Sequence, residues 1–217
     1  NRRTVVVLEG GAALTMPWAD DVTAILMAWY PGQEGGHAIA EVLFGDVNPS
    51  GRLPVSFPRA ESDLPEFVND ASAVTYGYYH GYRHLDREGV EALFPFGFGL
   101  SYTRFDYSNL ALSASRIERD GVLRVTTDVT NTGAVFGEEV VQLYISYEGS
   151  RVDRAVRDLK GFTRVRLEPG ETKTVSLELN VRDLAFFDVD TGKWEVEPIS
   201  YRVWVGPSSA ELSLSAS

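Results

Sequence analysis

Alternation of apolar and polar residues with a period of two runs through the second half of the chain, and it constrains the fold more than any other feature. Successive side chains of a β-strand point to opposite faces, so such a run predicts a strand with one buried and one exposed face. The pattern covers positions 123–129, 141–147, 175–181 and 199–205, and Leu212 and Leu214 add a short last strand.

Turn sequences separate these predicted strands. They are Asn131-Thr132-Gly133, Glu168-Pro169-Gly170 and Asp190-Thr191-Gly192. Short strands at this spacing predict that residues 106–217 form an antiparallel sandwich of two sheets, immunoglobulin-like in class. The chain has no cysteine, so this sandwich lacks the disulfide of antibody domains, and thiolate catalysis is excluded.

Residues 1–58 follow a different pattern. Residues 4–8 are a continuous apolar run, which is typical of a strand buried on both faces in a parallel sheet. Residues 22–30 favour a second strand because a Pro-Gly pair ends them, and residues 33–44 predict a helix with Gly45 as its C-terminal cap. These elements make only a partial α/β sandwich layer, and the sequence starts abruptly within it. We therefore expect the remaining strands to come from elsewhere.

Residues 59–105 are predicted to link the two parts. From 59 to 93 no period is sustained, which predicts a long connecting loop. The run Phe94-Pro-Phe-Gly-Phe-Gly-Leu-Ser-Tyr-Thr103 then combines three phenylalanines with Pro and Gly, so it predicts irregular backbone buried as an aromatic seam between two domains. Its glycines lack the third Gly and the surrounding strand and helix of a dinucleotide-binding loop.

Charge and hydropathy exclude several kinds of partner. The formal net charge of −11 disfavours nucleic acid and anionic membrane surfaces. The acidic residues are dispersed, which is typical of a solvated surface. No run approaches the roughly 18 apolar residues of a membrane helix, and the first residues do not resemble a signal peptide. The residues alone leave the compartment open.

The aromatic seam resembles the segment that joins the last two domains of family 3 glycoside hydrolases, the β-glucosidase and β-xylosidase group. Other stretches resemble the same family: Pro31-Gly-Gln-Glu-Gly-Gly36, Asn48-Pro-Ser-Gly-Arg-Leu-Pro54, Asp158-Leu-Lys-Gly-Phe162 and Leu167-Glu-Pro-Gly-Glu171. The resemblance implies the end of an α/β sandwich domain followed by a fibronectin type III-like domain, without the preceding (β/α)8 barrel. It also favours a periplasmic or secreted location. Ala155 and Ile199 depart from the family pattern, which puts only local turns in doubt.

Catalysis by such an enzyme needs two carboxyl groups about 5 to 5.5 Å apart, one as nucleophile and one as acid/base. The resemblance places both upstream of residues 4–8, so we expect no catalytic residue in this chain and no cofactor. Glu34 stands at a predicted helix start, where a carboxylate is structural. Asp20 and Asp21 are adjacent, so their side chains diverge.

Two stretches have a weak metal-site pattern. His80 and His84 have the spacing of two zinc ligands on a helix, but Gly81 and the surrounding rings disfavour a helix there, and no Glu follows His80. The run from Asp188 to Gly192 is faintly similar to a calcium loop, yet its twelfth position is Ile199 rather than Glu. The sequence therefore predicts no metal site.

The ring-rich stretch 76–83 is where we expect contact with a ligand. Tyr78, Tyr79, His80 and Arg83 are candidates for the rim of a substrate site, because sugars stack on aromatic rings and exchange hydrogen bonds with such side chains. The alternative is that Tyr78, Tyr79 and Tyr82 pack the joint between domains.

Two hypotheses follow. The first is the C-terminal fragment of a retaining β-glycosidase, most specifically a β-glucosidase, that acts on β-glucosides or oligosaccharides and is inactive without the missing barrel and sandwich portion of the same enzyme. The second is a free-standing non-catalytic β-sandwich module that binds carbohydrate or protein. The second does not explain a partial α/β layer. A closed core in residues 1–58 would favour the module.

Overall fold

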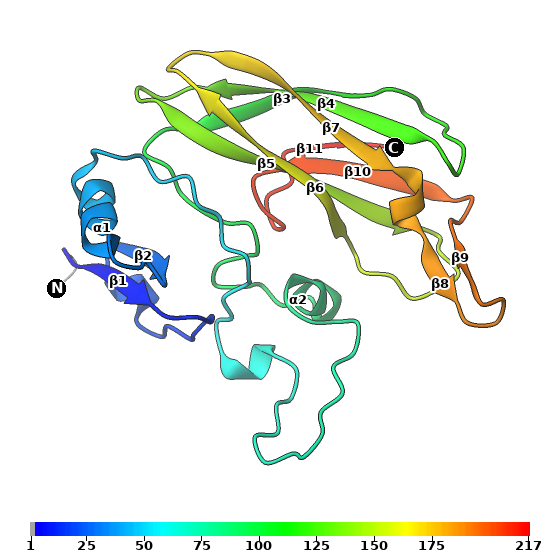
Figure 1. The fold of residues 1–217 in the computed structure, drawn as a ribbon, viewed down its shortest axis with the longest axis horizontal. Helices are drawn as coiled ribbons and strands as arrows, with labels where there is room; N and C mark the ends of the chain where they lie inside the picture. The colour runs from blue at the N-terminus through cyan, green and yellow to red at the C-terminus, as the bar shows by residue number, and fades with distance from the viewer. Residues whose placement is uncertain (1–2) are drawn as a thin grey trace.

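The predicted sandwich is present in the computed structural model, which describes residues 3–217 (Figure 1). One sheet has the order β3-β4-β7 and the other β11-β10-β5-β6, with antiparallel pairing throughout. The strands are β3 (Phe105–Leu112), β4 (Val122–Asn131), β5 (Gly137–Glu148), β6 (Asp158–Leu167), β7 (Thr172–Asn180), β10 (Ser200–Gly206) and β11 (Leu214–Ala216). A 3-10 turn (Val181–Leu184) leads into a hairpin of β8 (Phe186–Asp188) and β9 (Lys193–Glu195).

The inward faces of the two sheets form the hydrophobic core, as the alternation predicts. In β4, residues 123, 125, 127 and 129 are buried while their neighbours are exposed or half-buried. Val129, Val141, Leu143 and Ile145 have no exposed side-chain surface. Strand β5 departs from the alternation, because Gln142 and Tyr144 on its other face are also buried. That outer face is covered by the connecting region rather than by solvent.

The α/β part is small and open. Strands β1 (Val5–Glu9) and β2 (Ala24–Trp29) pair in parallel, a 3-10 turn (Ala19–Asp21) lies between them, and helix α1 (Gly35–Phe44) lies beside them (Figure 1). Gly45 ends α1 in the left-handed conformation, as predicted.

Burial of this part is lower than the sequence suggests. The strand predicted to be buried on both faces is only half-buried, and Val5 is 48% exposed. Tyr30 and Phe44, at the ends of β2 and α1, are more than four-fifths exposed. The apolar surface of residues 3–58 is therefore not closed into a core within the described chain.

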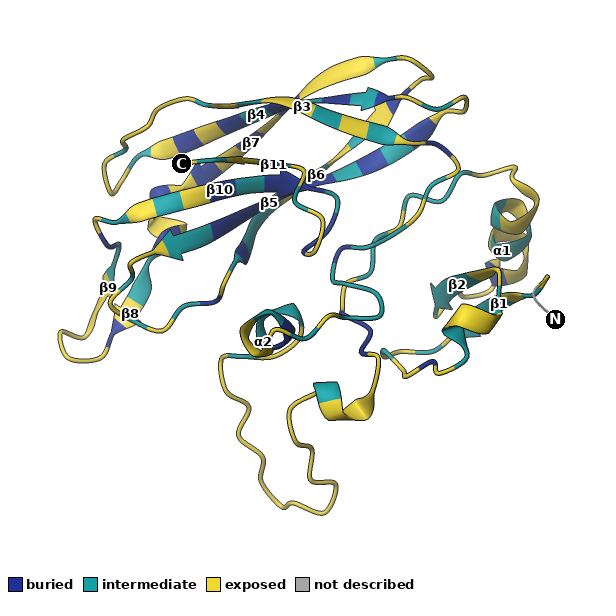
Figure 2. Cartoon of the chain, turned by 180° about the vertical axis from the view of Figure 1, so that it is seen from behind, coloured by how far each residue is buried: buried dark blue, intermediate teal, exposed yellow. Residues whose placement is uncertain are grey.

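The connecting region contains a helix that the sequence analysis missed. Residues 59–93 were predicted to be a loop, but α2 (Tyr82–Glu88) forms two turns there, and a 3-10 turn (Glu61–Asp63) precedes it. Gly81 does not break this helix; it stands at its N-terminal cap with φ of 57°. Residues 64–81 are irregular and largely exposed (Figure 2). Within residues 3–217, no helix is long and apolar enough to cross a membrane.

Candidate functional site

The aromatic seam joins the α/β part to the sandwich through two series of ring contacts. Trp29 of β2 contacts Phe57, Phe57 contacts Phe94, and Phe94 stacks on Phe98, with ring centroids 6.3, 6.3 and 5.4 Å apart. In the second series, Tyr82 of α2 stacks on Phe96 at 5.0 Å and meets Tyr144 of β5 edge-on at 6.1 Å. Backbone hydrogen bonds pair Phe57 with Phe94, so the seam is also held by its own main chain.

A buried ion pair reinforces this joint. Arg52 Nη2 donates to Glu139 Oε2 of β5 at 2.6 Å, and only 8% and 3% of the two side chains are exposed. The Tyr107 hydroxyl donates to the other oxygen of Glu139 at 3.0 Å. Burial raises the pKa of the Glu139 carboxyl above its ordinary value, against the opposing effect of Arg52. The pair therefore ties two segments far apart in sequence at the cost of desolvating both charges.

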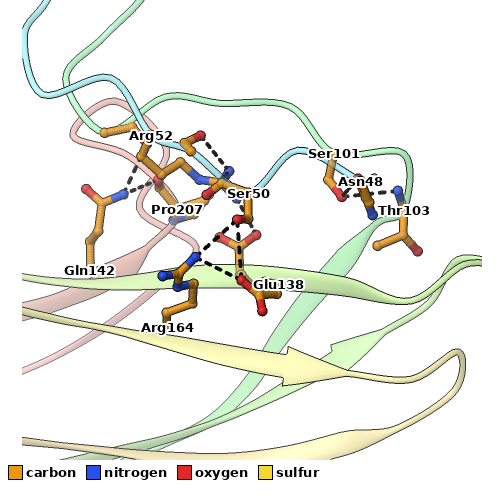
Figure 3. Close-up of polar contacts among 12 residues, drawn as sticks. Asn48, Ser50, Arg52, Ser101, Thr103, Glu138, Gln142, Arg164 and Pro207 are labelled. Atoms are coloured by element: carbon orange, nitrogen blue, oxygen red, sulfur yellow. Dashed lines mark hydrogen bonds and ion pairs between the residues drawn. The ribbon is translucent and has the colours of Figure 1, made fainter. Parts of the chain in front are cut away.

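Neutral hydrogen bonds extend the joint on either side (Figure 3). The Gln142 amide donates to the backbone oxygens of Gly97 and Pro207, and its Oε1 accepts from the Tyr144 hydroxyl at 2.7 Å. Asn48 Oδ1 accepts from the Ser101 hydroxyl at 3.0 Å. The outer face of β5 carries the polar side chain of Gln142 where it meets the seam, and the backbone oxygen of Gly97 in the seam accepts a hydrogen bond from it.

A second cluster, centred on Asp158 at the start of β6, holds α2 and the ring-rich stretch. Asp158 Oδ1 accepts from Arg83 Nε at 2.6 Å, and Oδ2 accepts from the hydroxyls of Tyr147 at 3.0 Å and Tyr78 at 3.3 Å. One residue earlier, Arg157 donates two hydrogen bonds of 2.8 Å to the carboxylate of Asp86.

The four rim candidates lie close together but in different environments. Tyr78 and Arg83 point to Asp158, and the Arg83 guanidinium lies 5.4 Å from the Tyr78 ring. The Tyr79 hydroxyl donates to Asp153 Oδ1 at 2.7 Å, and desolvation together with this bond raises the pKa of Tyr79 to about 12. His80 is exposed, and no hydrogen bond or ion pair joins it to the rest of residues 3–217. Their role toward a ligand stays a prediction.

A groove of about 530 Å³ opens beside this cluster. Tyr78 and Arg83 line one side of it, and the β8–β9 hairpin with the loop before β6 lines the other. On the hairpin, Phe187 and Trp194 are 48% and 62% exposed. Neither ring is among the residues predicted from the sequence; the signal that could have identified them is their place on either side of the Asp190-Thr-Gly192 turn.

Asp188 and Glu34, the weaker candidates from the sequence, occupy positions that serve a turn and a helix end. Asp188 Oδ1 accepts from the backbone N–H groups of Asp190 at 2.9 Å and Thr191 at 3.3 Å, which closes a hairpin turn. Glu34 is the N-terminal cap residue of α1, although its side chain makes no capping hydrogen bond. No group of three or more acidic or histidine side chains suited to a metal occurs in the described residues.

Comparison with known proteins adds the family context. The family model described as "Glycosyl hydrolase family 3 C-terminal domain" matches residues 1–102, and the "Fibronectin type III-like domain" matches residues 139–209. A curated relative from Rhizobium radiobacter, named "Beta-glucosidase", is 45% identical over 226 residues, which cover 100% of this chain and 28% of the relative. "Thermostable beta-glucosidase B" of Acetivibrio thermocellus is 41% identical over 98% of this chain and 29% of its own length.

Solved structures of β-glucosidases also match this chain over nearly its whole length. The β-D-glucoside glucohydrolase of Trichoderma reesei superposes with a TM-score of 0.92 at 32% identity, over 100% of this chain and 33% of that one. β-Glucosidase 3B of Thermotoga neapolitana, solved with α-D-glucose, superposes with a TM-score of 0.90 at 41% identity, over 98% of this chain and 30% of that one. The chain thus spans about a third or less of the relatives it matches.

Proposed function

The chain belongs to glycosyl hydrolase family 3, and we propose that it is the C-terminal part of a retaining β-glucosidase that hydrolyses terminal β-linked sugars. One observation carries the proposal: the chain aligns over 98–100% of its length with β-glucosidases, of which it spans only 28–29%. We expect both catalytic carboxylates to lie outside this chain, in the barrel and sandwich portion that the family resemblance implies for the same enzyme.

The buried acids of this chain support that assignment. A retaining mechanism needs one carboxylate free to attack and a second to exchange a proton. Glu139, Asp158 and Asp188 are instead bound to arginines, and Glu197 accepts from the Ser150 hydroxyl and the Arg151 backbone N–H. Each of these four carboxylates therefore has a structural partner within this chain.

We assign this chain the role of completing the α/β sandwich and docking the β-sandwich domain onto it. The proposed division is 1–58 for the α/β part, 59–105 for the linker with its aromatic seam, and 106–217 for the fibronectin type III-like domain. The exposed apolar side chains of Tyr30 and Phe44 support a neighbouring portion of the same enzyme as the partner of the first part.

We also propose that Tyr78, Tyr79, His80 and Arg83 form part of a rim facing the substrate. Asp158 fixes Tyr78 and Arg83, and Asp153 fixes Tyr79, so three of the four side chains are pre-oriented. His80 is exposed in the irregular segment just before α2, where it could donate to or accept from a sugar hydroxyl.

The test compares the full-length protein with the 217-residue chain on nitrophenyl β-glucoside. We expect turnover only by the full-length protein, with the β-anomer of glucose as the first product by NMR. Release of the α-anomer would contradict retention, and turnover by the purified chain alone would contradict the assignment of the carboxylates. Sugar binding by the chain, with no hydrolysis by either form, would favour the binding-module hypothesis.

A further inference from the structure

We propose that the groove between the ring-rich stretch and the β8–β9 hairpin binds a neutral glycan, with Trp194 and Phe187 as its stacking surface. The choice of a β-linked glucan as ligand rests on the proposed function. The presence of a glycan site rests on the groove itself, and the two can fail separately.

The two rings form one surface. Phe187 and Trp194 stand directly opposite each other in the hairpin register, so they share a face of the hairpin. Their centroids are 5.6 Å apart with an interplanar angle of 68°, and both line the groove. Leaving two large rings exposed side by side is unfavourable in water, which marks the surface as a contact site. The flat face of an aromatic ring is suited to the C–H face of a pyranose.

The hairpin that carries these rings is held rigid. Arg151 Nη2 bonds to Asp188 Oδ2 of β8 at 2.6 Å and to Glu195 Oε2 of β9 at 2.8 Å, and so clamps both strands. Arg119 Nη2 donates to the backbone oxygen of Trp194 at 2.6 Å. A ligand therefore meets a pre-organised surface and pays little ordering entropy.

The charges around the groove favour an uncharged ligand. Four cationic side chains line it, and four acidic ones balance them: Arg83, Arg151, Arg154 and Lys160 against Asp153, Asp158, Asp188 and Asp190. Asp158 and Asp188 are already paired with Arg83 and Arg151. An anion or a basic peptide would find no net charge here, whereas sugar hydroxyls can both donate and accept. The volume lies in the range of roughly 300–1,000 Å³ typical of ligand sites.

The test is native affinity electrophoresis of the full-length protein in gels with and without soluble mixed-linkage β-glucan. We expect the glucan to retard the unmodified protein. Trp194→Ala should raise the dissociation constant about tenfold, as for other aromatic anchors, and Trp194→Phe should restore most of the binding because it restores a stacking face. Phe162→Ala is the matched control, since Phe162 is 68% exposed on β6 and does not line the groove.

Each outcome bears on one claim. Absence of retardation, or equal retardation of Trp194→Ala and Phe162→Ala, overturns the proposal. Thermal unfolding of each variant shows whether a loss of binding is a loss of folding. If Trp194→Ala unfolds, Phe187→Ala keeps the test valid, because it removes the other ring that lines the groove and should also weaken binding. Hydrolysis of nitrophenyl β-glucoside without retardation in the gel refutes the proposed glycan site in the groove and leaves the β-glucosidase assignment intact. Retardation without hydrolysis refutes the β-glucosidase assignment and leaves the groove.

Discussion

At the scale of single residues, the buried pair Arg52–Glu139 shows how the joint is held. Its two charges are removed from water, so their attraction offsets a desolvation penalty rather than adding freely to stability. The Tyr107 hydroxyl uses the second carboxylate oxygen. Removal of either partner leaves a buried charge uncompensated, which is far more costly than the net gain from the intact pair.

Replacing Arg52 with Ala should destabilise the protein by about 3 kcal/mol at pH 7, because Glu139 is left buried and charged. Burial raises the pKa of the Glu139 carboxyl on folding. As the pH falls, the folded state therefore binds a proton at a higher pH than the unfolded state does. The destabilisation should therefore shrink as the pH falls from 7 towards 5. Urea unfolding at several pH values measures it.

The control for this prediction is Arg202→Ala. Arg202 pairs with Glu148, and both side chains are more than 40% exposed, so the loss should be under about 1 kcal/mol and nearly independent of pH over the same interval. Equal losses for Arg52→Ala and Arg202→Ala would show that burial does not set the strength of the joint.

Gly97 gives a second prediction at this scale. Its φ is +81°, and a Cβ there would lie 2.2 Å from Oε1 of Gln142. Gly97→Ala should cost about 1–2 kcal/mol for the left-handed backbone, and further stability because Gln142 must give up its bonds to the seam. Gly192→Ala has a similar φ of +65° and open space around it, so only the backbone cost applies. Equal shifts in the unfolding midpoint would contradict the steric argument.

At the scale of elements, α2 is stable only because of its contacts with the sandwich. Seven residues are too few for an isolated helix in water. Arg157 binds Asp86, Asp158 binds Arg83, and the Tyr82 hydroxyl accepts from the backbone N–H of Leu159 at 3.0 Å. Three consecutive residues of the sandwich therefore fix three positions of one helix.

Arg157→Ala and Asp158→Asn should each release α2 from β6. We expect amide hydrogen exchange in residues 82–88 to rise about tenfold or more, while the core strand β4 exchanges as before. Arg182→Ala is the control, because it removes an ion pair with Asp120 in which the two side chains are 72% and 66% exposed. Unchanged exchange in α2 after both substitutions would mean that the aromatic stacking of Tyr82 suffices to hold it.

How far the sequence predicts these elements depends on where their stability comes from. The strands can be predicted from the alternation, because burial of one face requires apolar residues such as Val125 and Val129 at every second position. Helix α2 leaves no such record, since its partners Arg157 and Asp158 lie more than 70 positions away. The tyrosines of the candidate site could be identified from the sequence because they cluster within a few positions. Asp158, the carboxylate that orients Tyr78, could not, because it lies 80 positions away.

At the scale of the whole molecule, the two parts differ in how well they cover their apolar surface. The sandwich core is closed, whereas Val5, Tyr30 and Phe44 of the α/β part stay exposed in this chain. Several large apolar side chains exposed in so small a part of the chain indicate a surface that is covered by a partner. We assign this one to the remaining portion of the proposed enzyme.

The 217-residue chain should therefore bind the dye ANS strongly, and the full-length protein should bind it much less per molecule. Tyr30→Ser with Phe44→Ser should reduce dye binding by the chain without changing the unfolding midpoint of the sandwich. Val189→Ser serves as the control, because Val189 is 82% exposed in the turn between β8 and β9, and this hairpin lies at the opposite end of the molecule from β1, β2 and α1 (Figure 1). Equal dye fluorescence from the chain and the full-length protein would contradict this account.

Strand β5 is enclosed on both sides, by the opposite sheet on one face and by the seam on the other, where Gln142 and Tyr144 are buried. Genetic recombination that moved the sandwich alone into another protein would expose Gln142 and Tyr144 on the outer face of β5 to solvent. A viable transfer has to carry residues 94–103 along with it. A transferable unit therefore begins before the first strand of the sandwich, and a graft should place the crossover upstream of Arg52, so that the ion pair with Glu139 is kept.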